Sequence, residues 1–135
     1  ILACDRSCHD HLAYCLAFVK LGWVSPEKYT EVRSVHETLF HNHLPQHIVF
    51  VNPPFEYVKE KIQERWKKTG KVKWREDNFE YLHAVHDSYQ ETYAPLSDNT
   101  LELHCTGLEE RVSQVHEWAS QRINHNNNTV EPVFL

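Results

Sequence analysis

The sequence contains little glycine, and this scarcity limits the ligand sites that it can build. Among 135 residues there are three glycines, Gly22, Gly70 and Gly107, and they lie far apart. Neither the GxxxxGK[ST] phosphate loop nor the GxGxxG dinucleotide motif is present. Both motifs use glycine to bring backbone N–H groups close to phosphates, so the usual means of wrapping a triphosphate is missing. We therefore do not expect this chain to be a kinase by itself.

The sequence also lacks an excess of positive charge and a long apolar run. Its formal net charge is −5, which argues against general nucleic-acid binding because such binding depends on clustered cations. No stretch approaches the roughly 18 consecutive apolar residues of a membrane-spanning helix, and the first residues show no signal-peptide pattern. We therefore expect neither a nucleic-acid partner nor a direct membrane span.

The cysteines do not follow a pattern typical of a disulfide framework or a zinc module. Cys4, Cys8 and Cys15 fall within a strand-then-helix pattern, which favours reduced thiols and suits the cytosol or the mitochondrial matrix. The densest group of thiols and imidazoles is Cys4-x3-Cys8-His9-x-His11, and its spacing differs from that of the familiar zinc modules. We predict no metal site, and we keep a zinc-stabilised interaction module around Cys4, Cys8 and His11 as a distant alternative.

The apolar periodicity predicts strands that alternate with helices. Continuous or alternating apolar runs predict strands at residues 1–4, 47–52 and 101–105. Helical spacing predicts helices after Ser7, after Ser25, after Pro54, from about Asp77 and after Thr106. Because the strands are separated by helices, we expect an α/β fold with a parallel sheet and helices on both faces.

Two features of the predicted strands indicate how the sheet is built. They are the apolar character of residues 47–52 and the small number of strands. The strand is continuously apolar between prolines, which is typical of a strand buried on both faces of a parallel sheet. Three strands are fewer than such sheets usually have, so we expect that a partner segment is absent. We assign residues 1–123 to one domain and the polar residues 124–135 to an extended tail.

A basic segment from Lys61 to Arg75 holds half of the chain's 14 lysines and arginines. A helix end and a flexible loop with several cations could close over a polyphosphate. The same cations could simply complement a helix C-terminus and keep a surface helix soluble. We expect the helix that precedes this segment to dissolve near Arg65 and the segment itself to be mobile.

The residues Asp5-Arg6-Ser7 follow the first predicted strand and form a second candidate site. At the end of a parallel strand, Asp5 and Arg6 could lie beside a substrate hydroxyl or phosphate. Alternatively, they form a structural ion pair, and Ser7 caps the next helix.

Three motifs in order resemble the C-terminal half of the deoxyribonucleoside kinases. They are Asp5-Arg6-Ser7, Lys61-x3-Arg65-x-Lys67 and Tyr81-Leu82-x2-Val85-His86. In that family the first motif carries an arginine near the substrate 5′-hydroxyl, and a lid of the form Arg-x3-Arg-x-Arg clasps phosphates. The resemblance implies a partial P-loop-kinase-like, three-layer fold without its N-terminal phosphate-loop half. It further implies vestigial catalytic candidates Asp5 and Arg6 and phosphate-binding lid candidates Lys61, Arg65 and Lys67.

The sequence departs from the kinase pattern at the lid. Two of the three lid arginines are lysines, and this change removes bidentate phosphate geometry and leaves point charges. The acidic residues expected just after the lid are replaced by Lys68-Thr69-Gly70-Lys71, which argues against the family's mode of sugar recognition.

A narrower resemblance is to the nucleoside-kinase-like accessory subunits of mitochondrial respiratory complex I. It depends on residues 29–35, on Leu44-Pro45-Gln46-His47-Ile48-Val49, on Pro53-Pro54 and on Tyr93-Ala94-Pro95-Leu96. It implies a non-catalytic subunit that acts in assembly or stability, contacts other subunits and lies on the matrix side of the inner membrane. It implies no definite cofactor, and it leaves open whether a nucleotide binds in a vestigial site. The alternative is part of a deoxyribonucleoside or nucleotide kinase that transfers phosphate to a nucleoside 5′-hydroxyl.

Overall fold

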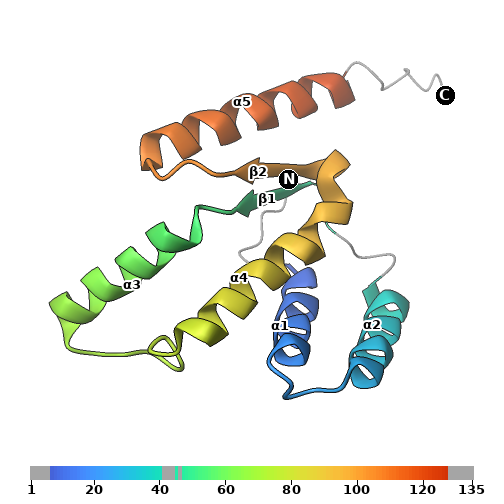
Figure 1. Ribbon diagram of the computed structural model, residues 1–135. Helices are drawn as coiled ribbons and strands as arrows, with labels where there is room; N and C mark the ends of the chain where they lie inside the picture. The colour runs from blue at the N-terminus through green and yellow to red at the C-terminus, as the bar shows by residue number, and fades with distance from the viewer. Residues whose placement is uncertain (1–6, 41–44, 46, 128–135) are drawn as a thin grey trace.

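The described part of the chain is mostly helical and contains one small parallel sheet (Figure 1). The computed structural model describes residues 7–40, 45 and 47–127, and the side chains of these residues up to 122. The elements, in chain order, are α1 (His9–Lys20), α2 (Pro26–Phe40), β1 (Ile48–Val51), α3 (Phe55–Thr69), α4 (Phe79–Tyr93), the 3-10 helix η1 (Ala94–Asn99), β2 (Thr100–Leu103) and α5 (Leu108–Asn127). The mixed α/β class and the parallel pairing of the strands are therefore confirmed. None of the helices in this part of the chain combines the length and the hydropathy that a membrane span requires.

The sheet pairs two strands that are distant in the sequence. β1 and β2 run parallel, with Ile48 opposite Thr100 and Val51 opposite Leu103. The chain between them passes through α3, α4 and η1. In Figure 1, α5 lies along β2 on one side of the strands, and α1, α2 and α4 lie on the other. The strand predicted at residues 1–4 lies outside the described residues.

The expectation that β1 is buried on both faces is wrong for the described residues. Ile48 is buried and Phe50 is half-buried, whereas Val49 and Val51 on the opposite face are 41% and 47% exposed. Side chains alternate between the two faces of a strand, so one face of β1 is covered and the other is apolar but partly exposed, because α5 contacts β2. A continuous apolar run shows that both faces of a strand are apolar, but it does not show whether other segments cover them.

The core lies between α1 and α4, which pack along each other. Small residues line the contact, and Ala13, Ala17 and Ser88 are wholly buried there. Small side chains allow two helix axes to approach closely. At the sheet end of α4, Tyr93 stacks on Phe50 with ring centroids 4.7 Å apart, so aromatic packing joins this helix pair to β1.

The expectation that the third helix dissolves near Arg65 is also wrong. α3 continues to Thr69, and Gly70 caps it with a left-handed φ of 65° and an N–H that donates to the Trp66 carbonyl at 2.8 Å. Lysine, glutamine and glutamate are good helix formers, and glycine at this position permits the left-handed cap. The helix therefore ends at its glycine and includes the first part of the basic segment.

The loop after α3, which we expected to be mobile, makes defined contacts with the rest of the chain. The Arg75 guanidinium lies over the Trp23 ring at 4.3 Å and over the Trp74 ring at 5.0 Å. Trp23 in turn stacks on Tyr81 of α4, with centroids 5.8 Å apart. Aromatic and cation–π contacts thus join the loop to the α1–α2 connection and to α4.

The last helix extends further than the sequence predicts. α5 continues to Asn127 and so includes residues 124–127 of the expected extended tail, while residues 128–135 lie outside the described part. Extending an existing helix fixes one residue for each hydrogen bond gained, so polar residues with modest helix propensity can continue it. At its start, Arg111 Nε donates to the Cys105 carbonyl at 2.8 Å and joins α5 to the exit of β2.

Candidate functional site

A cleft runs along the two strands, from Thr100 at the start of β2 to Asn52 and His104 at the carboxyl ends, where its polar residues gather. Asn52 directly follows β1 and His104 directly follows β2, and the pairing of Val51 with Leu103 brings them to the same edge. Ligand sites in parallel α/β folds form at this edge. The cleft has a volume of about 480 Å³, and its lining includes Phe50, Asn52, Gln90, Tyr93, Glu102 and His104.

Asn52 is the centre of a hydrogen-bond network in this strand-end cleft. Its buried side chain donates through Nδ2 to Glu102 Oε1 at 2.6 Å and accepts at Oδ1 from Gln90 Nε2 at 3.4 Å. The backbone carbonyl of Asn52 lies 3.1 Å from His104 Nδ1. The cleft therefore presents a carboxylate, an imidazole and two amides, which suit the binding of a small polar ligand.

The sequence patterns used above do not single out Asn52 or His104. A usable signal exists, because each is the polar residue directly after an apolar strand. In a parallel sheet, two such positions meet at one edge whenever the strands are neighbours and in register. Glu102 and Gln90 join them only through the register of β2 and the packing of α4, which the sequence alone does not give.

Two of the predicted lid cations are paired with carboxylates of the same chain. Lys61 Nζ contacts Glu64 Oε2 at 2.7 Å, and Arg65 is paired with Glu76 from the loop after α3. The hydrogen bond to Glu64 raises the pKa of Lys61. The Arg65–Glu76 pair joins this loop to α3, so Arg65 has a structural partner.

The predicted lid residues do not converge on one face of α3. An α-helix turns by about 100° per residue, so Lys61 and Arg65 lie roughly 40° apart around the axis. Lys67 lies roughly 160° from Arg65 around the axis, on the other side of the helix, where it is exposed. In this helix Lys61 and Arg65 therefore share one face, and Lys67 lies on another.

The first predicted motif lies almost entirely outside the described residues. Asp5 and Arg6 are not described, so their roles remain predictions. Ser7 Oγ accepts a hydrogen bond from the His9 N–H at 3.2 Å at the start of α1. This contact agrees with the alternative in which the serine caps the helix.

A second cavity of about 280 Å³ lies between α1, α2 and the junction of α4 with η1. Its lining includes His9, Arg33, His36, Glu37, Glu91 and Leu96. Arg33 Nε donates to Glu37 Oε1 at 2.9 Å, so a guanidinium and a carboxylate at its wall are paired with each other. This cavity is smaller than the strand-end cleft and contains the two buried histidines of the described residues.

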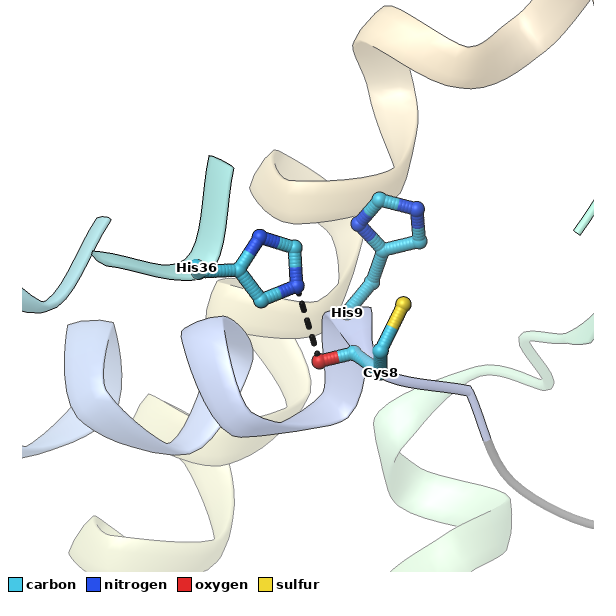
Figure 2. A group of neighbouring side chains, drawn as sticks. All are labelled: Cys8, His9 and His36. Carbon is cyan, nitrogen blue, oxygen red and sulfur yellow. Dashed lines mark hydrogen bonds between the residues drawn. The ribbon is translucent and has the colours of Figure 1, made fainter. Parts of the chain in front are cut away.

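Cys8, His9 and His36 form a compact group beside this cavity (Figure 2). Their sulfur and nitrogen ligand atoms all lie within 4.8 Å of one another, and His9 and His36 are each 7% exposed. His36 Nε2 makes a 3.1 Å hydrogen bond with the Cys8 carbonyl. Burial, and secondly the neighbouring His36, lower the pKa of His9, although Asp10 acts in the opposite direction.

This group overlaps only in part with the thiol and imidazole group recognised in the sequence. Cys8 and His9 belong to both groups, His11 is exposed on α1 and does not join, and Cys4 lies outside the described residues. His36 is supplied by α2, which folds back beside α1. Only this tertiary contact reveals the third residue, because nothing in the local spacing connects His36 to Cys8.

Comparisons of the chain with protein-family models, with curated protein sequences and with solved structures found no match. The resemblance to the deoxyribonucleoside kinases therefore stays a prediction. The geometry defines a mixed α/β chain with a strand-end cleft and a separate Cys/His/His group.

Proposed function

We propose that this chain is a non-catalytic accessory subunit of mitochondrial respiratory complex I (NADH:ubiquinone oxidoreductase). In this proposal it keeps a degenerate, P-loop-kinase-like fold and acts in assembly or stability, on the matrix side of the inner membrane. The observation that carries the proposal is the amount of apolar surface exposed on α2, β1 and α5.

The exposed apolar side chains follow the periodicity of their elements. On α2 they recur at helical spacing, at Val32, Val35 and Leu39. On α5, Leu108 and Val112 are 74% and 59% exposed and lie one turn apart. Stripes of this kind are typical of surfaces that contact other protein. A subunit that is surrounded by neighbours in a large complex would bury them.

The state of the lid cations supports a role other than phosphoryl transfer. A kinase lid needs several cations free to neutralise a transferred phosphoryl group. Here Lys61 and Arg65 are paired with Glu64 and Glu76, and Lys67 points away from both. This arrangement favours an accessory subunit over a partial kinase.

The experiment is recovery of the full chain from mitochondria in mild detergent through an affinity tag. We expect complex I subunits to be recovered with it, and the purified chain to transfer no phosphate from ATP to deoxynucleosides. Phosphoryl transfer that Arg6→Ala abolishes would overturn the proposal in favour of the kinase alternative. Recovery of the chain without complex I subunits would also overturn it.

A further inference from the structure

We propose that Cys8, His9 and His36 bind a divalent cation of the zinc class, and that the bound cation links the start of α1 to α2. Two imidazoles and a thiolate are ligands that Zn²⁺ prefers. The inference is independent of the proposed function, because it depends only on these three side chains and their surroundings.

The geometry of the group brings the ligand atoms close to the separation that a metal requires. Bonds of about 2.0–2.3 Å to one tetrahedral centre place ligand atoms roughly 3.5 Å apart. The observed atoms lie within 4.8 Å of one another, so rotations about side-chain bonds can close the remaining gap. Figure 2 shows the Cys8 thiol and the His9 ring on the side of α1 that faces the His36 ring.

His36 is the residue that joins α2 to the start of α1. α2 has 15 residues, and His36 is its one buried side chain. Its imidazole makes a 3.1 Å hydrogen bond with the Cys8 carbonyl and packs against the rings of His9 and Phe40, so it already joins α2 to the start of α1. A metal bond would make the imidazole the anchor of α2.

The adjoining cavity supplies room for a fourth ligand. His9 and His36 both line the cavity of about 280 Å³, and the protein offers three ligand atoms. Zinc sites with three protein ligands complete a tetrahedron with water. A water in this cavity would also lie near Arg33 and Glu37, which can hydrogen-bond it.

Cation binding changes the protonation of the group in a defined way. The Cys8 thiol loses its proton to solvent and forms the metal–sulfur bond as a thiolate. His36 exchanges its hydrogen bond to the Cys8 carbonyl for a metal bond, and its ring proton moves from Nε2 to Nδ1. His9 binds as the neutral imidazole, so one proton is released for each cation bound.

The test is titration of the full chain, freed of any histidine tag, with Co²⁺ and then with Zn²⁺ as the competitor. We expect one Co²⁺ per chain, with the near-ultraviolet absorption of a thiolate–cobalt bond, and its displacement by Zn²⁺. Cys8→Ser should abolish the thiolate band, and His36→Gln should weaken binding at least about tenfold, which corresponds to about 1.4 kcal/mol.

Matched variants separate this site from the other cysteines and histidines. Cys15→Ser and His11→Gln alter residues of α1 that do not belong to the group, and both should bind Co²⁺ as the unaltered chain does. Circular dichroism checks that every variant is folded. Absence of stoichiometric binding, or a thiolate band that Cys8→Ser retains or Cys15→Ser removes, would overturn the proposal.

A second readout tests the proposed link between the helices. Zn²⁺ should slow amide hydrogen exchange in α2 of the unaltered chain, because the cation fixes His36 to α1. The same addition should leave exchange in the His36→Gln variant unchanged. Equal protection of α2 in both proteins would show that the cation acts elsewhere and would overturn the proposal.

Discussion

Ser88 lies wholly buried at the contact between α1 and α4, and its hydroxyl has no hydrogen-bond partner among the described residues. A buried polar group without a partner lowers stability by about 1–3 kcal/mol. Its small size suits the close approach of the two helices, alongside Ala13 and Ala17. The serine side chain therefore fits the small space between the helices, but its hydroxyl finds no hydrogen-bond partner there.

Ser88→Ala should raise the free energy of unfolding by about 1 kcal/mol, because alanine keeps the volume and removes the unpaired hydroxyl. Urea unfolding followed by circular dichroism measures this change. The control is Ser113→Ala on the exposed side of α5, which should change stability by less than about 0.5 kcal/mol. A loss of stability in the Ser88 variant would mean that the hydroxyl makes a stabilising bond.

At the scale of the elements, the loop between α3 and α4 contains a strained residue. Arg75 has a φ of 55°, in the left-handed region that residues other than glycine rarely adopt. Its guanidinium lies over the rings of Trp23 and Trp74, and these contacts compensate for the backbone strain. The loop conformation is therefore a balance between strain and cation–π attraction.

A pair of substitutions separates these two effects. Arg75→Ala removes the ring contacts and keeps the strain, so it should destabilise the chain by about 1 kcal/mol. Arg75→Gly removes the same contacts but relieves the strain, so it should be more stable than the alanine variant by about 1 kcal/mol. Urea unfolding of the two variants measures the difference. Equal stabilities would contradict the claim that the backbone at residue 75 is strained.

The helices and strands were largely predictable because their signals are local. Apolar spacing marks each helix, and Gly70 marks the end of α3, although the lysines before it suggested an earlier end. Lysine favours helix as much as it favours solvent, so a basic run is no sign that a helix has ended.

Burial and the site residues were less predictable because they depend on contacts between distant segments. The exposure of Val49 and Val51 depends on what covers one face of β1. The group of Cys8 and His9 gains its third member, His36, only when α2 packs beside α1. Asn52 and His104 are the exception, since a rule about the ends of parallel strands could have identified them.

At the scale of the whole molecule, the apolar stripe of α5, formed by Leu108 and Val112, is the proposed contact surface for a neighbouring subunit. Burying Val112 against a neighbouring subunit would contribute about 1.5 kcal/mol, and a carboxylate at that position would oppose association because its charge loses hydration. The adjacent Ser113 is also exposed but lies about 100° around the helix. The pair Val112→Asp and Ser113→Asp therefore places the same charge on and beside the stripe.

The most direct test is the amount of complex I recovered with each of these variants from mitochondria, relative to the unaltered chain. We predict that Val112→Asp lowers recovery at least about tenfold, equivalent to about 1.4 kcal/mol, while Ser113→Asp recovers as much as the unaltered chain. Circular dichroism of the purified variants checks that both are folded. Equal recovery with both variants, or no complex I with the unaltered chain, would contradict the account.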